Sequence, residues 1–132
     1  MAYRTLAVVV LIALASGTAA RAHHSYASTY DVSNQVRLEG RLLTFQLRNP
    51  HSYVHVQAPD ESGEMQRWAV EWAGAGALGR QGIGRDSLRV GDEVVVTANP
   101  SRARGEYRAL MLSLVRPSDG LSWGDDPDEI VD

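Results

Sequence analysis

The chain has 132 residues, no cysteine and a formal net charge of −3 at pH 7. That length is enough for one domain, and the absence of cysteine excludes disulfide bonds and thiolate metal sites. The negative charge argues against nucleic acid as a main partner, because contacts with phosphate dominate the affinity of proteins for nucleic acids.

The first 22 residues have the pattern of an export signal. Arg4 supplies a positive charge, residues 6–15 form an apolar stretch, and small residues follow up to Ala22. A membrane-spanning helix needs about 20 apolar residues, so this stretch is too short to span a bilayer. We therefore predict cleavage after Ala22 and a periplasmic or secreted protein without a membrane span. Cleavage after Ala20 and an uncleaved anchor are the alternatives.

Removing residues 1–22 leaves 132 less 22, or 110, residues. The signal takes two of the 13 arginines with it, so 11 arginines stand against 16 acidic residues, a net charge of −5. Residues 23–34 are polar with interspersed tyrosines, and they predict an extended lead-in that the tyrosines lay against the body. A barrel domain is predicted over residues 35–118, and an acidic C-terminal tail over residues 119–132.

The barrel domain opens with a strand-like pattern from Gln35. Val36 and Leu38 alternate with polar residues, but after Gly40 the apolar residues take the opposite parity. A glycine at such a switch predicts a bulge or a sharp bend. A long, bent first strand is what a small closed barrel needs to connect its two halves.

Four more strands and one helix are predicted after this first strand. Alternating apolar patterns predict strands over residues 51–57, 66–73, 93–98 and 106–116, and a glycine-rich segment predicts a short helix over residues 75–80. A helix is the alternative for the last strand, because Ala, Leu and Met also favour helix. The predicted fold is all-β, a small five-stranded OB-like barrel with one short helix between strands 3 and 4.

The third predicted strand carries two tryptophans and a glutamate. Trp68 and Trp72 share one face of the strand, whereas Glu71 lies on the other. We expect the tryptophans to be core residues, with a sugar-binding platform as the alternative. Glu71 is expected to face solvent; the alternative is a carboxyl group whose pKa is raised by an apolar setting.

Four histidines are the candidate metal ligands. If the signal is cut after Ala22, His23 becomes the N-terminus and offers two nitrogens, its α-amine and its Nδ1. An opposing imidazole would complete three nitrogens in a T shape, a histidine brace, which suits copper. His51 and His55 share one strand face but lie about 13 Å apart, so only one of them is expected to share an ion with His23. His24 is the local alternative for the third nitrogen.

Other chemical signals are weak. No nucleophile motif, phosphate loop or carboxylate pair at an informative spacing occurs in the sequence. Arg102, Arg104 and Arg108 form a candidate cationic rim, but a solvated loop is the expected state. We therefore expect a binding protein rather than an enzyme, although an open position on a bound copper ion would allow redox chemistry.

Four short motifs are distributed along the chain: AHHS at residues 22–25, NPHS at 49–52, LGRQG at 78–82 and GDEV at 91–94. Together they resemble a family of small exported bacterial proteins of unknown function. The resemblance implies export and a small β-rich fold, and it implies no activity. Leu47-Arg48 stands where that family has an aromatic residue, a departure that would alter the packing near the NPHS motif.

Two functions of different classes fit these observations. The first is a non-catalytic protein that binds copper through its N-terminal histidine; if the cut falls elsewhere, the N-terminal histidines have no ligand role. The second is an envelope adaptor that contacts a protein, glycan or small ligand through one face of the barrel. The adaptor requires an exposed aromatic patch around Trp68, Trp72 or Tyr53, and histidines that do not converge.

Overall fold

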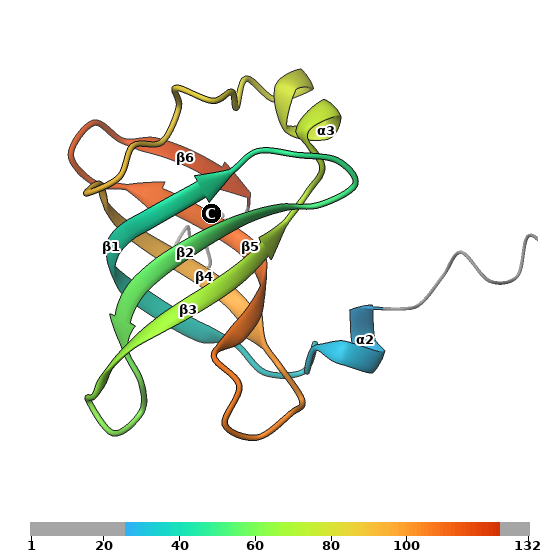
Figure 1. Ribbon diagram of the computed structural model, residues 1–132, viewed down its shortest axis with the longest axis vertical. Coiled ribbons are helices and arrows are strands. Elements are labelled where there is room, and N and C mark those ends of the chain that lie inside the picture. The colour runs from blue at the N-terminus through green and yellow to red at the C-terminus, as the bar shows by residue number, and fades with distance from the viewer. Residues whose placement is uncertain (1–25, 125–132) are drawn as a thin grey trace, which may run out of the picture.

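The computed structural model describes residues 26–124, and these form a small β-barrel with two short helices (Figure 1). The elements in chain order are α2 (Tyr26–Thr29), β1 (Val36–Gln46), β2 (Ser52–Pro59), β3 (Met65–Trp72), α3 (Ala75–Arg80), β4 (Glu93–Pro100), β5 (Arg108–Arg116) and β6 (Leu121–Gly124).

The strands pair in the order β3-β2-β1-β4-β5-β6, and a parallel pairing between β3 and β5 closes the first five into a barrel. Every other pairing is antiparallel. Five strands with a helix between the third and the fourth define an OB-type barrel, so the predicted fold class is confirmed. The last predicted strand is indeed β5, and the alternative of a helix there is wrong.

Strand β1 serves both halves of the barrel, as its pattern predicts. Its first half pairs with β4 and its second half with β2, and Arg41 pairs with both neighbours. The bulge lies between Leu42 and Thr44 and not at Gly40. Gly40 is required for another reason: a Cβ there would collide with the carbonyl oxygen of Gln57 on β2.

Substitution of Gly40 by alanine is therefore expected to destabilise the barrel by about 1–3 kcal/mol, the usual cost of forcing an extra methyl group into a packed site. The matched control is Gly79→Ala in α3, where an added Cβ meets no atom within 4 Å. That control should leave stability unchanged or raise it by up to about 1 kcal/mol, because alanine favours helix. Urea denaturation of both variants measures the difference, and equal stabilities would contradict the close-approach argument.

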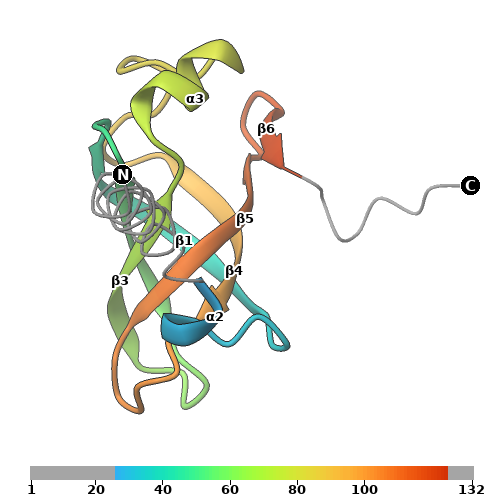
Figure 2. The same ribbon diagram turned by 90° about the vertical axis from the view of Figure 1, so that its right-hand side faces the viewer.

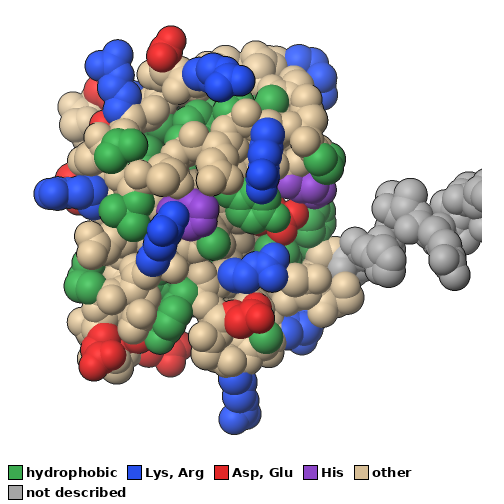
Figure 3. Space-filling view, in the orientation of Figure 1, with side chains coloured by type: hydrophobic (Ala, Val, Ile, Leu, Met, Phe, Trp, Pro, Cys, Tyr) green, Lys and Arg blue, Asp and Glu red, His purple; other side chains and the backbone are tan. Residues whose placement is uncertain are grey.

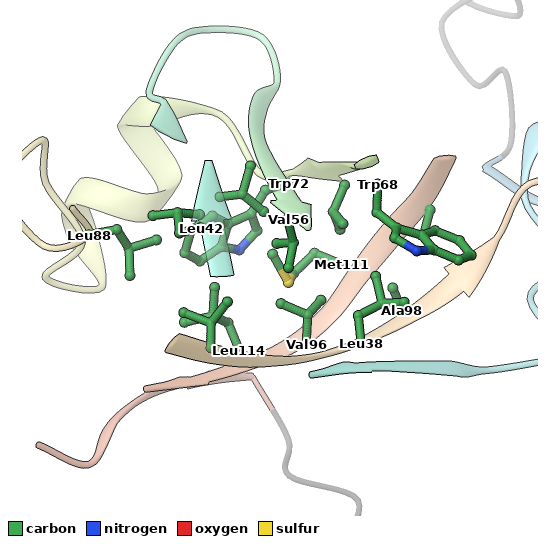
Figure 4. Packing of buried hydrophobic residues seen from close by; sticks show 14 of the residues in the cluster. Leu38, Leu42, Val56, Trp68, Trp72, Leu88, Val96, Ala98, Met111 and Leu114 are labelled. Carbon is green, nitrogen blue, oxygen red and sulfur yellow. The ribbon is translucent and has the colours of Figure 1, made fainter. Parts of the chain in front are cut away.

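The core fills the barrel with apolar side chains from all five strands (Figure 4). Leu38, Val96 and Leu114, from β1, β4 and β5, are almost wholly buried. Beyond β3, the chain passes through α3 at one end of the barrel, where Leu78 is fully buried (Figure 1). The two strand tryptophans, Trp68 and Trp72, are also buried, which confirms that they belong to the core.

Both ends of the described chain contain elements that the sequence pattern does not predict. The described part of the lead-in begins with the single helical turn of α2 and so is not extended throughout. The range assigned to the acidic tail begins with β6, which pairs with β5, and Trp123 of β6 packs edge-on against Trp72 with ring centroids 5.1 Å apart. Alternation analysis misses both elements because each has only four residues.

Candidate functional site

A histidine and a buried carboxylate lie side by side on the outside of the barrel. His51 directly precedes β2, and its Nδ1 is 2.9 Å from Oε1 of Glu71 on β3. The register of the two strands explains this contact, because Tyr53 on β2 is the direct partner of Glu71. The side chain of His51 remains about one-third exposed, whereas Glu71 is nearly buried.

The expectation that Glu71 faces solvent is wrong. Strand alternation does put Glu71 on the outer face, but the lead-in folds back over that face and covers it. Tyr30, which is only 1% exposed, donates its hydroxyl proton to Oε2 of Glu71 over 2.5 Å. His51 is a second polar neighbour, with its Nδ1 on the other carboxylate oxygen of Glu71. Polar partners therefore replace the water that this buried carboxylate has lost.

Burial and the Glu71 carboxylate together raise the pKa of three nearby tyrosines. Burial, followed by the hydrogen bond to Glu71 and its negative charge, raises the pKa of Tyr30 well above its usual value. Burial and the same carboxylate also raise the pKa of Tyr26 and of Tyr53. All three phenols therefore keep their protons at neutral pH, and that of Tyr30 is donated to Glu71.

The contact with Glu71 determines which nitrogen of His51 is available to a ligand. An ionised carboxylate only accepts hydrogen bonds, so Nδ1 of His51 is the donor in this pair. A neutral imidazole then carries its free lone pair on Nε2. Metal-binding histidines show the same arrangement, with one ring nitrogen on the metal and the other donating to a carboxylate. In a neutral His51, Nε2 is thus the ring nitrogen that is available to a ligand.

His55, the other candidate on β2, has different surroundings. Its Nδ1 lies 2.7 Å from Oγ1 of Thr44, and burial, followed by the positive charge of Arg67, lowers its pKa. The neighbouring guanidinium also opposes a metal cation at this position. Figure 3 shows the two described histidines as separate patches on one face of the molecule. The structure therefore does not bring His51 and His55 together.

The remaining predicted ligands, His23 and His24, lie outside the described residues. Within residues 26–124, no three or more His, Asp or Glu side chains gather closely enough to hold a metal ion. The first described residue, Tyr26, does contact the site: its hydroxyl is 3.3 Å from Nδ1 of His51, and the two rings meet edge-on with centroids 6.0 Å apart.

Hydrogen bonds from the loop between β4 and β5 hold the lead-in in this position. Arg102 donates from its backbone to the carbonyl oxygen of Thr29 at 2.9 Å and from Nε to that of Ala27 at 2.7 Å. Tyr30 and Ser101 form a β-bridge, so the loop and the lead-in run side by side. Figures 1 and 2 show α2 outside the barrel where β3 meets β5. The three arginines of this loop region, Arg102, Arg104 and Arg108, are exposed, in line with the expected solvated loop, and Arg102 makes these contacts in addition.

The sequence analysis names Glu71 and Arg102 and expects the lead-in tyrosines to lie against the body, but it does not bring these residues together in one cluster. Glu71, Tyr30 and Arg102 owe their roles to the folding of the lead-in over the barrel, which no local periodicity reports. A weak signal was present in the tyrosines of the polar lead-in, because a buried tyrosine needs a polar partner for its hydroxyl group.

Fold and site together define a small closed β-barrel that carries a histidine–carboxylate pair beneath a fastened N-terminal segment. Residues 10–109 match the model of a family of unknown function, DUF6152, and the chain belongs to that family. No curated protein matches the sequence significantly. None of the helices in the described part of the chain is long and apolar enough to cross a membrane.

Among solved structures, the barrel is similar to the mitochondrial single-stranded DNA binding protein Rim1 from S. cerevisiae. The TM-score is 0.44 at 13% sequence identity, and the match covers 61% of this chain and 90% of Rim1. The OB-type assignment stands on the strand order and the barrel closure described above.

Proposed function

We propose that this protein is exported, is cleaved after Ala22 and binds one copper ion. His51 supplies Nε2, and the new N-terminal residue, His23, supplies its α-amine and its Nδ1. The observation that supports the proposal is the contact of His51 Nδ1 with the buried Glu71, because it leaves Nε2 with the free lone pair when the imidazole is neutral.

The position of Tyr26 supports His51 rather than His55 as the partner of the N-terminus. His23 is three residues before Tyr26, so their Cα atoms are at most about 11 Å apart. Tyr26 touches His51, whereas His55 lies about 13 Å further along β2. His24, two residues before Tyr26, is within the same reach and is the alternative source of the third nitrogen.

The donor chemistry favours copper. Three nitrogen ligands in a T-shaped arrangement suit the tetragonal geometry of Cu(II), and copper has the highest affinity in the series of divalent first-row metals. An α-amine has a pKa of about 7.7–8.0, so part of it is free at neutral pH and the metal displaces the remaining protons. The proposal is for binding, since no residue of the cluster identifies a substrate.

The adaptor alternative has less support. It requires an exposed aromatic patch, but Trp68 and Trp72 are buried, and Arg48 covers the ring of Tyr53 at 5.2 Å from its centroid. The exposed large apolar side chains among the described residues are scattered over different elements: Tyr26, Val32, Met65 and Val90.

The test compares two processed chains in a copper titration, one that begins at His23 and one with a single added glycine before it. Mass spectrometry of the exported protein first establishes the natural N-terminus. The chain that begins at His23 should bind one Cu(II), and the added glycine should weaken binding because the amine no longer belongs to a histidine. Equal affinities of the two chains would rule out the proposed ligand set.

A further inference from the structure

The lead-in, residues 26–34, lies on the outside of the barrel and has almost no buried surface of its own. No residue of α2 is buried, and Tyr30 is the single buried side chain in this segment. Tyr30 also lies outside the connected hydrophobic cluster that fills the barrel. Figure 2 shows α2 beside the strands, outside the barrel wall. Detachment of the lead-in would therefore leave the core of the barrel intact.

Arg102, in the loop between β4 and β5, makes several of the polar contacts that hold the lead-in. Its Nε donates to the carbonyl oxygen of Ala27 at 2.7 Å, and its Nη2 is 3.8 Å from Oδ1 of Asp31. Its backbone N–H donates to the carbonyl oxygen of Thr29, a bond that does not depend on the side chain. Because the Arg102 side chain is 49% exposed, it can be shortened without leaving a cavity in the core.

The histidine–carboxylate pair, by contrast, belongs to the barrel. His51 directly precedes β2 and Glu71 lies in β3, so detachment of the lead-in would leave the two side chains in place. It would remove Tyr30 from Glu71 and Tyr26 from His51. The chain before Tyr26 would then no longer be held near His51. In the proposed copper site that part of the chain supplies the other nitrogens, so only the closed state offers the full ligand set.

We propose that the lead-in opens and closes over the barrel as a unit of its own, and that this local opening regulates the proposed copper site. Segments with few buried apolar contacts open at a lower free energy than the core of a protein. The regulation rests on the proposed function, since it needs a copper ion held by both the lead-in and His51. Arg102 is then a positioning residue, which contacts no proposed ligand and stabilises the closed state.

Amide hydrogen exchange of the processed protein without copper tests the local opening. The backbone N–H of Asp31 donates to the carbonyl oxygen of Pro100 at 2.8 Å, so its exchange reports detachment of the lead-in. Mass spectrometry of peptides should show faster exchange in the lead-in than in β4 and β5. Equal exchange rates in the lead-in and in these strands would mean that the lead-in opens only when the barrel unfolds, and would overturn the proposal.

Two arginines of the same loop provide a matched pair of variants. Arg102→Ala should speed exchange in the lead-in about tenfold, the factor expected for loss of one partly exposed hydrogen bond from a charged donor. Arg102→Lys keeps a charged donor and should restore part of the protection. Arg104→Ala is the control, because Arg104 is exposed and makes no hydrogen bond or ion pair with residues 26–34. Equal effects of the two alanine variants would contradict the role of Arg102.

Copper itself tests the regulation. An ion that binds only the closed state must in turn hold the lead-in closed, so saturating Cu(II) should slow exchange in the lead-in about tenfold or more. Arg102→Ala should weaken copper binding by the factor by which it lowers the closed fraction, without changing the nitrogen ligands seen by electron paramagnetic resonance. Copper that binds without slowing this exchange would overturn the regulation and leave the copper site standing. Absence of copper binding would overturn the proposed function and the regulation, whereas the copper-free comparison still decides on the opening.

Discussion

Replacement of His51 by alanine is expected to lower the copper affinity of the processed protein by about 100-fold or more. The substitution removes one of three proposed nitrogen ligands, and loss of an outer-shell partner alone typically costs 10- to 100-fold. His51 is partly exposed and lies outside the core cluster, so the barrel should remain folded. Competition titration against a copper chelator measures the affinity, and electron paramagnetic resonance reports the change in nitrogen ligands.

The matched control for that experiment is His55→Ala, which removes the other histidine of β2 and should leave copper affinity unchanged. Glu71→Gln should give an intermediate loss of about 10- to 100-fold, because it keeps the shape of the side chain but weakens the orientation of the His51 ring. If His55→Ala costs as much affinity as His51→Ala, the assignment of His51 fails.

Replacement of Trp72 by alanine is expected to lower the free energy of unfolding by about 3–5 kcal/mol, the usual cost of truncating a buried tryptophan. Trp72 is 2% exposed and packs against Phe45 of β1 and Trp123 of β6, with ring centroids 5.8 and 5.1 Å away. The substitution therefore leaves a cavity where three strands meet. Urea denaturation in the presence of a chelator measures the loss without a contribution from bound metal.

Two further variants test this reasoning. Trp72→Phe should cost less than Trp72→Ala, because it keeps a ring and removes an indole donor that has no partner among the described residues. Met65→Ala, at an exposed position of the same strand, should change stability by no more than about 0.5 kcal/mol. A loss for Met65→Ala as large as that for Trp72→Ala would mean that burial does not determine the effect.

The strands and their order along the chain can be predicted from the sequence, because each strand has one face in the core. The alternation of apolar and polar residues identifies that face. Closure of the barrel through the parallel pairing of Ala69–Glu71 with Arg108–Leu110 is not visible in any local pattern. The sequence predicts this closure only because the order of its strands and helix matches that of an OB-type barrel. Gly40 shows what the sequence pattern leaves open. The change of parity after Gly40 predicts a bulge or bend there, but the structure has the bulge between Leu42 and Thr44 and a close approach of Gly40 to Gln57 on β2.

The candidate site was predicted less completely than the fold. Histidine is rare in the chain, so His51 was an obvious candidate from its residue type alone. The features that distinguish it from His55 are tertiary: the carboxylate of Glu71 on the next strand and the lead-in that buries this carboxylate. These contacts join residues 20 and 41 positions apart, which no spacing rule within one strand connects.

The lead-in held on the barrel would make the proposed copper binding depend on the folded state. Tyr30 and Arg102 hold the segment before β1 through contacts with the barrel itself, so folding places Tyr26 beside His51. An unfolded chain keeps its N-terminal amine but loses the opposing imidazole. An ion that binds the folded chain alone stabilises it by about 2.7 kcal/mol when present at 100 times its dissociation constant. If copper binds at the proposed site, the free energy of unfolding of the barrel would therefore rise with the concentration of copper.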